Sequence, residues 1–223
     1  MKKDELLYIV NKLDEMYPTA RPMLDFTSPY ELLVAVTLSA QCTDERVNKV
    51  TRELFKVANT PQQMSELSEE QILSHIKTCG LGSAKSKALK NASRDILEKF
   101  GGEVPADIKL LQTLQGVGIK TANVVASVAF GIPAIAVDTH VFRVSNRLGL
   151  ANGKTLTKTQ TDLEKNIPKE NWIKAHHHLI FHGRAVCKAQ RPQCEVCGLK
   201  DNCKFHKANL RKLERKNLKN TAK

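Results

Sequence analysis

The sequence predicts an all-α protein, and three observations support this prediction. Apolar residues recur at helical spacing along most of the chain, whereas no segment shows a convincing strand-like alternation. Aromatic residues make up only 5% of the 223 residues, so Leu, Ile, Val and Ala must supply most of the core. A chain of this length can form one large domain or two smaller ones and can bury a substantial core.

The predicted helices can be followed in order from their apolar positions and their caps. Residues 6–13 have amphipathic spacing and mark the first helix. Ser28 and Pro29 suit the N-cap and first position of the next one, and Ser68 begins a sequence of capping-box form. A loop is expected over residues 149–154. The helices after the first are predicted over residues 30–38, 44–57, 72–78, 84–100, 110–114, 119–130, 139–148, 158–166 and 172–185.

The chain is strongly basic, with 35 Lys and Arg against 23 Asp and Glu and a net charge of +12. Residues 211–223 hold six basic residues and one acidic residue, so the remainder still carries +7. A folded body this basic favours a polyanionic partner, although a cationic surface without such a partner is the alternative. We expect residues 212–223 to form a basic, disordered tail.

No targeting or membrane segment is expected. The N-terminus lacks the apolar core of a signal peptide, and no apolar run approaches the length of a membrane span. We therefore expect a cytoplasmic protein that does not enter a membrane and whose thiols stay reduced.

Four of the six cysteines lie close together with the spacing C-x6-C-x2-C-x5-C: Cys187, Cys194, Cys197 and Cys203. Four thiolates on a short loop suit either zinc or a [4Fe–4S] cluster. Zinc modules usually present two C-x2-C pairs, whereas only Cys194 and Cys197 form such a pair here. The uneven spacing therefore favours the cluster, and the absence of a secretion signal disfavours disulfides.

A G-x-G turn stands between two predicted helices, in the sequence LQGVGIKTA at residues 114–122. Gly116 and Gly118 allow positive φ and let a ligand approach the backbone. The N–H groups at the start of the second helix can receive a phosphate. Alone, this motif is more typical of an ordinary tight turn, but the apolar helix that follows and the basic body favour a helix-hairpin-helix that binds DNA.

Two residues near the hairpin have the side chains that sugar chemistry requires. Lys120 lies in the first turn of the second helix, where the helix dipole disfavours a cation and so favours the neutral, nucleophilic amine. A neutral amine can form a Schiff base with a sugar C1′, although a simple phosphate-binding lysine is the alternative. Asp138 can N-cap the helix over 139–148 and can also serve as a base that stabilises positive charge at C1′.

Three segments in this order resemble the endonuclease III family, the bifunctional DNA glycosylases and abasic-site lyases of the helix-hairpin-helix superfamily: LQGVGIKTANVV, AVDTHVFRVSNRLG and HGRAVCKAQRPQCEVCGLKDNC. The resemblance covers residues 3–207, and the three motifs together are highly specific. It implies two helical lobes with a DNA-binding cleft between them. A six-helix barrel would cover residues 22–132, and residues 1–21 and 133–211 would form the lobe that holds one [4Fe–4S] cluster.

The resemblance also implies the reaction, which belongs to base excision repair. The substrates are oxidised pyrimidines in duplex DNA, such as thymine glycol, and abasic sites. Lys120 matches the nucleophile and Asp138 the catalytic aspartate. The damaged nucleotide is flipped out of the helix, Lys120 attacks C1′ to expel the base and form an imine, and β-elimination cuts the strand 3′ to the lesion. A monomer located at the nucleoid is expected.

Further residues are assigned to DNA by the resemblance. Gln41 matches the glutamine that fills the gap left by the flipped base, and Leu81 matches the leucine that wedges into the opposite strand. Without the resemblance, Leu81 would be interpreted as a core residue. Asp44 matches an acidic residue near the pocket. The other expected DNA contacts are Gly116, Gly118, His140, Arg143, Arg184, Lys188 and Arg191.

Three residues depart from the family pattern. Gln115 stands where proline is usual, Ile119 where Arg or Lys is common, and Gly82 where an aromatic residue is frequent. These departures affect the hairpin, a phosphate contact and the contacts to the unpaired base, rather than the chemistry.

Three other functions account for fewer of these features. An adenine-mispair glycosylase usually lacks a lysine at the hairpin position and carries an additional C-terminal domain. A non-catalytic DNA-binding module with a structural metal leaves the pairing of Lys120 and Asp138 unexplained. An electron-transfer protein is disfavoured, because the chain offers one cluster and no second redox centre.

Overall fold

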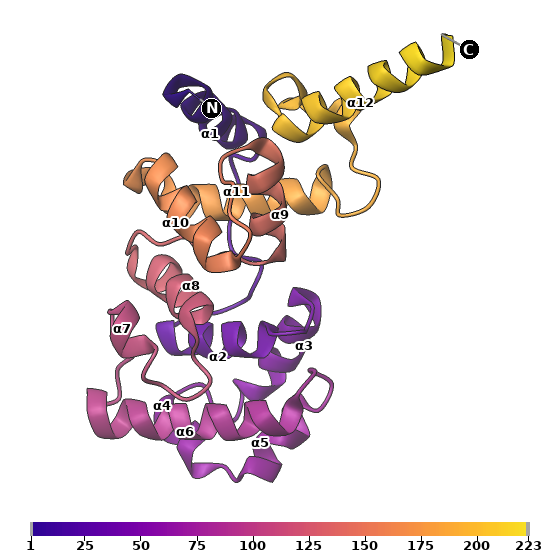
Figure 1. Ribbon diagram of the computed structural model, residues 1–223. Helices are drawn as coiled ribbons and strands as arrows, with labels where there is room; N and C mark the ends of the chain where they lie inside the picture. The colour runs from indigo at the N-terminus through magenta and orange to yellow at the C-terminus, as the bar shows by residue number, and fades with distance from the viewer. Residues whose placement is uncertain (1, 222–223) are drawn as a thin grey trace. The chain divides into compact units, whose positions relative to one another are not determined.

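The structure is a computed structural model that describes residues 2–221, with side chains described up to residue 215. Every regular element in this part of the chain is a helix, which confirms the all-α fold class (Figure 1). None of the described helices has both the length and the apolar composition of a membrane span. The α-helices are α1 (Lys3–Met16), α2 (Pro29–Ser39), α3 (Asp44–Leu54), α4 (Pro61–Glu66), α5 (Glu69–Ile76), α6 (Gly82–Phe100), α7 (Ile108–Leu111), α8 (Ile119–Phe130), α9 (Thr139–Leu148), α10 (Leu156–Asn166), α11 (Trp172–Ala185) and α12 (Lys204–Thr221), and the 3₁₀ helices are η1 (Lys169–Asn171), η2 (Cys194–Val196) and η3 (Lys200–Asn202).

The helices predicted over residues 119–130, 139–148 and 172–185 have the same bounds in the structure. The helix predicted over residues 44–57 ends earlier, at Leu54, because the next residues form turns that bond back to its last turn. Helix α4 was not predicted, although Thr60 and Pro61 provide the N-cap and first-position signal.

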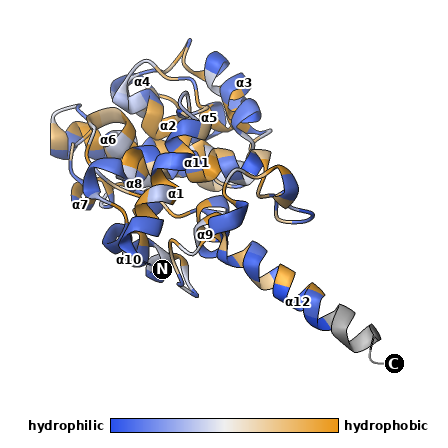
Figure 2. Ribbon diagram, turned by 90° about the horizontal axis from the view of Figure 1, so that it is seen from above, coloured by the Kyte–Doolittle hydropathy of each residue, from blue (hydrophilic) through white to orange (hydrophobic). Residues whose placement is uncertain are grey.

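The C-terminal segment corrects one prediction. Disorder was expected over residues 212–223, but α12 continues as a helix to Thr221, so the prediction was wrong for residues 212–221. This segment is rich in Lys and Leu, which favour helices, and contains no Gly or Pro, so its charge does not prevent local helix formation. Figure 2 shows the coloured part of α12 as largely hydrophilic. Leu210 and Leu213 of this helix are exposed. Residues 222 and 223 lie outside the described residues.

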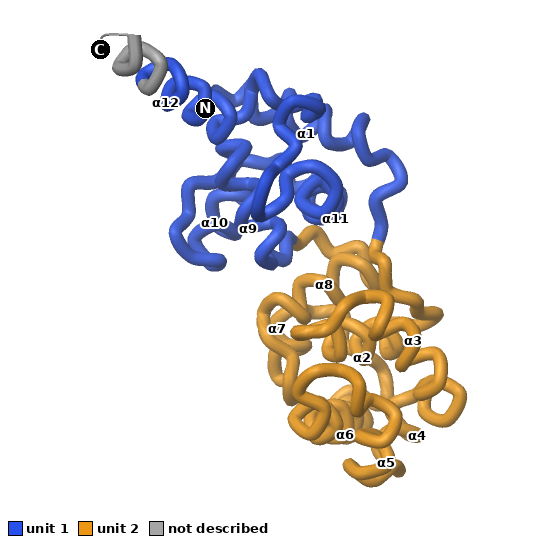
Figure 3. The backbone as a smooth tube through the Cα atoms, turned by 90° about the vertical axis from the view of Figure 1, so that its right-hand side faces the viewer, with its two compact units in different colours: residues 1–21, 135–223 blue, residues 22–134 orange. Residues whose placement is uncertain are grey.

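The chain divides into two compact units, which Figure 3 shows in different colours. Unit 1 consists of residues 1–21 and 135–223, and unit 2 of residues 22–134. Each unit has a hydrophobic core of its own, so each can be understood from its own packing.

Helix α2 lies at the centre of unit 2. Residues 30–38 are all buried, because the sequence PYELLVAVTLS has no broad polar face, and α2 packs against α3, α6 and α8. The Ser28 hydroxyl accepts a 3.1 Å hydrogen bond from the Glu31 N–H, which confirms the predicted N-cap. The Tyr30 hydroxyl forms a 2.6 Å hydrogen bond with the Ser93 hydroxyl, which ties α2 to α6.

Helices α7 and α8 pack against each other and form the predicted hairpin. Gly116 in the turn has a φ of 80°, and a Cβ added there would lie 2.7 Å from the Cβ of Ala88 in α6. The Gln115 side chain accepts a hydrogen bond from Asn91, also in α6. Gly118 is the N-cap of α8, and a Cβ added there would meet no atom within 4 Å. The turn is therefore anchored to α6 at Gly116 and open at Gly118.

Unit 1 joins the N-terminal helix to the C-terminal half of the chain. Helix α11 packs against α1 and α9, and α9 also packs against α10 and α12. Ile9 and Leu13 from α1 share one core with Val141 from α9 and Leu179 from α11. The first helix of the sequence is therefore an integral part of the unit that contains the clustered cysteines.

We predict that Gly116→Ala will destabilise the protein by about 2 kcal/mol. The added methyl group would clash with Ala88, and alanine at a φ of 80° is strained. Gly118→Ala is the matched control, with an expected loss below about 1 kcal/mol, because its φ of −82° is ordinary and its surroundings are open. Thermal unfolding followed by circular dichroism measures both variants, and equal losses would contradict this account of the turn.

Candidate functional site

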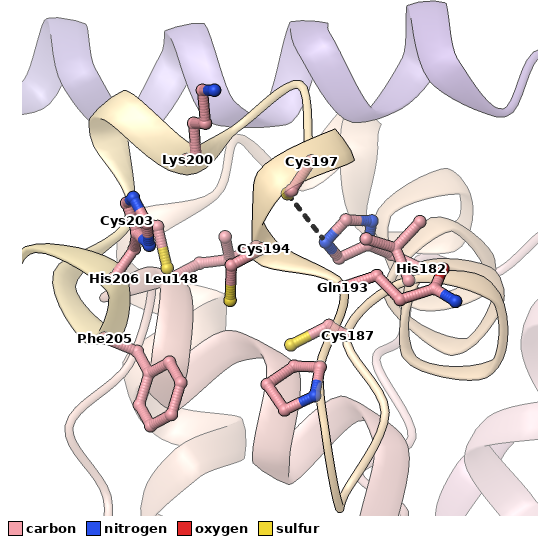
Figure 4. A pocket seen from close by; sticks show the side chains of 12 residues that line it. Leu148, His182, Cys187, Gln193, Cys194, Cys197, Lys200, Cys203, Phe205 and His206 are labelled. Atoms are coloured by element: carbon pink, nitrogen blue, oxygen red, sulfur yellow. Dashed lines mark hydrogen bonds between the residues drawn. The ribbon is translucent and has the colours of Figure 1, made fainter. Parts of the chain in front are cut away.

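The four clustered cysteines line one pocket in unit 1. Cys187 follows α11, Cys194 begins η2, Cys197 follows η2 and Cys203 follows η3. In Figure 4 the sulfurs of Cys187, Cys194 and Cys203 point toward a common space. Two short turns place the later cysteines, because the Cys197 N–H donates to the Cys194 carbonyl at 3.1 Å and the Cys203 N–H to the Lys200 carbonyl at 3.2 Å.

The donor set fits an iron–sulfur cluster. Cysteine thiolates are the usual ligands of such clusters, and the described pocket lining contains no Asp or Glu. Burial raises the pKa of the Cys194, Cys197 and Cys203 thiols, so iron must displace their protons when it binds. Among the described residues, no group of three His, Cys, Asp or Glu side chains is placed to hold a single metal ion. All four cysteine thiols nevertheless line this one pocket.

Arg143 of α9 holds the chain just before the cysteine loop. Its Nε donates to the Cys187 carbonyl at 3.1 Å, and its Nη2 donates to the Gly183 carbonyl at 3.0 Å. The same Nη2 lies 3.2 Å from His140 Nδ1. These contacts give Arg143 a structural role that the sequence analysis did not assign, while the DNA contacts expected of Arg143 and His140 stay predictions.

Arg147, one helical turn further along α9, holds the loop itself and was missed by sequence reasoning. It donates to the carbonyls of Lys188 at 2.7 Å and Ala189 at 2.9 Å, and its Nη1 lies 3.6 Å from Cys187 Sγ. Its guanidinium stacks 4.6 Å from the centre of the Phe205 ring. No local pattern in the sequence indicated this contact, because Arg147 lies 41 positions from Lys188.

His182 of α11 connects a cluster ligand to the segment after α1. Its Nδ1 lies 2.9 Å from the Tyr17 hydroxyl, and its Nε2 lies 3.7 Å from Cys197 Sγ (dashed in Figure 4). Burial lowers the pKa of His182 to about 4, and burial together with the Cys197 and Cys187 thiols raises the pKa of Tyr17 to about 12. Both groups are therefore neutral near pH 7, and Tyr17 can donate to Nδ1 while Nε2–H faces the sulfur.

The basic residues predicted to contact DNA near the cluster are exposed. Arg184 lies in the last turn of α11, and Lys188 and Arg191 lie between the first two cluster ligands. Arg191 has a φ of 48°, so the loop bends sharply at this residue. The arrangement gives the cysteine loop a cationic, solvent-facing surface that suits phosphates.

Lys120 is the second residue of α8 and is exposed. The first N–H groups of a helix have no partner within it, and the N-cap Gly118 has no side chain to satisfy them. The start of α8 is therefore a position that favours an anion, with the Lys120 amine beside it.

Asp138 is the N-cap of α9, as the sequence suggested, and is half-buried. Its Oδ1 accepts a 2.7 Å hydrogen bond from the Val141 N–H. The residues before it are anchored by Ile135 and Val137, which belong to the core of unit 1. The carboxylate is thereby fixed in orientation at the N-terminus of α9.

In unit 2, the loop after α2 that contains Gln41 touches the loop before α6 that contains Leu81. These are called the Gln41 loop and the Leu81 loop. A Cβ added to Gly80 would lie only 3.2 Å from the Gln41 carbonyl oxygen. Both Gln41 and Leu81 have positive φ, at 55° and 62°. The Leu81 side chain is 58% exposed, so its interpretation as a core residue is wrong. Asp44 begins α3 close after Gln41 in the sequence and is half-buried.

A side chain at Gly82 would meet a residue of α5. A Cβ at Gly82 would lie 2.8 Å from Leu73 Cδ1, so the aromatic residue frequent in the family would require Leu73 to move.

Two family profiles match the chain. Residues 34–169 match the HhH-GPD superfamily base excision DNA repair protein. Residues 187–203 match the iron-sulfur binding domain of endonuclease III, a match that begins at the first ligand cysteine and ends at the last.

Characterised relatives match over nearly their whole length. Endonuclease III of Haemophilus influenzae and that of Escherichia coli K12 are each 47% identical over 205 residues, which is 92% of this chain and 97% of the relative. Endonuclease III of Bacillus subtilis is 47% identical over 201 residues, covering 90% of this chain and 92% of the relative.

Solved structures show the same likeness. A trapped endonuclease III–DNA covalent intermediate has a TM-score of 0.89 at 44% identity, covering 94% of this chain and 99% of that chain. A non-covalent endonuclease III–DNA complex also has a TM-score of 0.89 at 44% identity, covering 95% and 99%. The chain therefore belongs to the endonuclease III family of base excision DNA repair proteins, and its cofactor is one [4Fe–4S] cluster.

Proposed function

We propose that this protein removes oxidised pyrimidines, such as thymine glycol, from duplex DNA and then cuts the strand at the resulting abasic site. The observation that carries this proposal is Lys120, an exposed amine in the first turn of α8 beside the open backbone of Gly118, in a chain of this family. A protein that only binds DNA needs no nucleophile at this position, whereas Schiff-base chemistry does.

Lys120 acts on the sugar of the flipped nucleotide. Its Nζ attacks C1′, and the bond between C1′ and the base breaks as the new C–N bond forms. The base departs with the electron pair of that bond and takes up a proton. Loss of an amine proton and opening of the sugar ring give an imine, and removal of a C2′ proton then expels the 3′ phosphate.

Asp138 supplies the carboxylate for this chemistry. It receives a proton during the attack and stabilises the positive charge that develops at C1′. Its capping bond to Val141 uses Oδ1 and fixes the orientation of the carboxylate before substrate arrives. Asp44 is proposed as a second acidic residue near the base pocket.

The Gln41 and Leu81 loops act on the DNA duplex. Gln41 fills the space that the flipped base leaves, and the exposed Leu81 side chain inserts into the opposite strand. The backbone at Gly116 and Gly118 binds a phosphate of the damaged strand. Because phosphates are the same in every sequence, the affinity from these contacts does not depend on base sequence.

The cluster, when bound, links four cysteines and so fixes the conformation of the basic loop. Arg184, Lys188 and Arg191 on or beside this loop contact phosphates, together with His140 and Arg143 of α9. We propose a monomer that works in the cytoplasm on nucleoid DNA, and abasic sites are a second substrate because the lyase step needs only the sugar.

We predict that Lys120→Gln will abolish the covalent adduct that borohydride traps on thymine-glycol duplex, because glutamine cannot form an imine. DNA binding should remain largely intact, since the hairpin backbone is unchanged. Lys109→Gln, at an exposed lysine of α7 in the same hairpin, is the matched control and should still form the adduct. A trapped adduct with Lys120→Gln would show that another amine is the nucleophile.

We predict that Asp138→Asn will slow base release by about 10² to 10⁴-fold with little loss of stability. Asparagine can still cap α9 but carries no charge to offset the developing cation. Asp107→Asn is the control, since Asp107 caps α7 in the same way, through hydrogen bonds from the N–H groups of Lys109 and Leu110. Single-turnover base release and thermal unfolding measure the two effects, and normal turnover would remove Asp138 from the catalytic site.

A further inference from the structure

Lys85 is a buried lysine that the proposed chemistry does not use. It lies in the first turns of α6 and is 5% exposed. Burial lowers its pKa, and the neighbouring Cys79 and Cys42 act in the opposite direction. A buried amine is costly unless acceptors surround it, so its partners indicate what it stabilises.

The Lys85 amine binds the end of the central helix. Nζ donates to the Leu38 carbonyl at 2.8 Å and to the Ala40 carbonyl at 2.6 Å. These carbonyls lie at the C-terminal end of α2, where the helix dipole is negative and the last carbonyls lack intrahelical partners. Ala40 has left the helical conformation, with a φ of −59° and a ψ of 116°, so Lys85 stabilises the point where the chain turns away from α2.

Gln41 is the first residue after this turning point. This residue has a φ of 55°, a conformation that residues other than glycine rarely adopt and that must be held by its surroundings. The amine of Lys85 binds the carbonyl of the residue immediately before it. The position of the Gln41 side chain therefore depends on Lys85.

The helix that carries Lys85 begins directly after the second loop. Leu81 is the N-cap of α6 and has a positive φ of 62°, and its carbonyl accepts the first hydrogen bond of the helix, at 3.0 Å from the Lys85 N–H. Gly80 lies so close to the Gln41 carbonyl that no side chain fits between the two loops without displacement. The Lys85 amine therefore holds the Gln41 loop at the point where it touches the Leu81 loop.

We propose that Lys85 is a positioning residue for lesion recognition, which holds the Gln41 and Leu81 side chains together as a preformed pair. This inference rests on the proposed contacts of these two residues with DNA. Lys85 itself is too deeply buried to contact a phosphate, so it acts through the two loops. Preformed loops do not have to be ordered when the damaged duplex binds, and affinity for the lesion rises accordingly.

The test is Lys85→Met, which keeps the length of the side chain and removes its donors. Binding is measured on a duplex with a stable tetrahydrofuran abasic analogue and on an undamaged duplex. We expect affinity for the analogue to fall roughly tenfold to hundredfold, with little change for undamaged DNA. The rate of adduct formation at saturating substrate should change much less, and Lys85→Arg should recover part of the affinity.

Lys90→Met is the matched control. Lys90 lies on the same helix, and its amine likewise donates to a loop carbonyl, that of Leu67, away from the two loops. Thermal unfolding shows whether each variant is folded. If Lys85→Met does not fold, Lys85→Gln, which can still donate a hydrogen bond, takes its place. An equal loss of affinity in the Lys85 and Lys90 variants would overturn the proposal, because it would reflect general destabilisation.

A double-mutant cycle separates this proposal from the function on which it rests. In a Gln41→Ala/Leu81→Ala background, Lys85→Met should cause no further loss of affinity for the analogue, since the side chains that it positions are gone. A full additional loss would overturn the role of Lys85 alone. If the Gln41→Ala/Leu81→Ala protein binds the analogue normally, the proposed DNA contacts of the two loops are wrong, and the role of Lys85 is overturned with them.

Discussion

Helix α2 is buried along residues 30–38, so both of its ends must be satisfied by neighbouring groups rather than by water. At the start, Ser28 caps the helix, and the buried Glu31 accepts hydrogen bonds from the N–H and hydroxyl of Thr27. At the end, the amine of Lys85 binds two carbonyls. The rest of unit 2 packs around this helix, and the Gln41 loop begins where it ends. The need to satisfy the buried end of α2 therefore fixes the position of Gln41, which is proposed to contact DNA.

In unit 1, the segment between α11 and α12 contains only the short 3₁₀ helices η2 and η3. Its conformation must therefore be held by contacts with other groups of the unit. The cluster joins its four cysteines, while Arg143 and Arg147 bind the carbonyls of the same segment from α9. Cluster thiolates are negative, so the guanidinium of Arg147 beside Cys187 offsets part of that charge. Helix α9 also begins at Asp138, so one short helix carries both the proposed catalytic carboxylate and the supports of the cluster loop.

The two proposed catalytic residues use helix N-termini in opposite ways. Lys120 follows the open N-terminus of α8, whose first N–H groups have no partner within the helix, whereas Asp138 caps the N-terminus of α9 with its own side chain. The start of α8 is therefore left for the proposed DNA phosphate, and the start of α9 fixes the orientation of the proposed catalytic carboxylate.

The sequence by itself determined the helical class, several helix bounds, the two N-caps at Ser28 and Asp138, and the cysteine set for the cluster. These features are local, because apolar spacing, cap residues and C-x2-C pairs act within a few residues. The helix over residues 212–221 was not predicted, because the high charge of this segment suggested a disordered tail.

Only the tertiary structure decided which distant residues meet. Lys85 lies 45 positions from Ala40 and Arg147 lies 41 positions from Lys188, and no local pattern connects either pair. The exposure of Leu81 likewise depends on the packing of its loop against Gln41, although its apolar side chain suggested burial. Local propensity selects the helices, but hydrogen bonds between buried groups far apart in the chain select the conformation of the loops that join them.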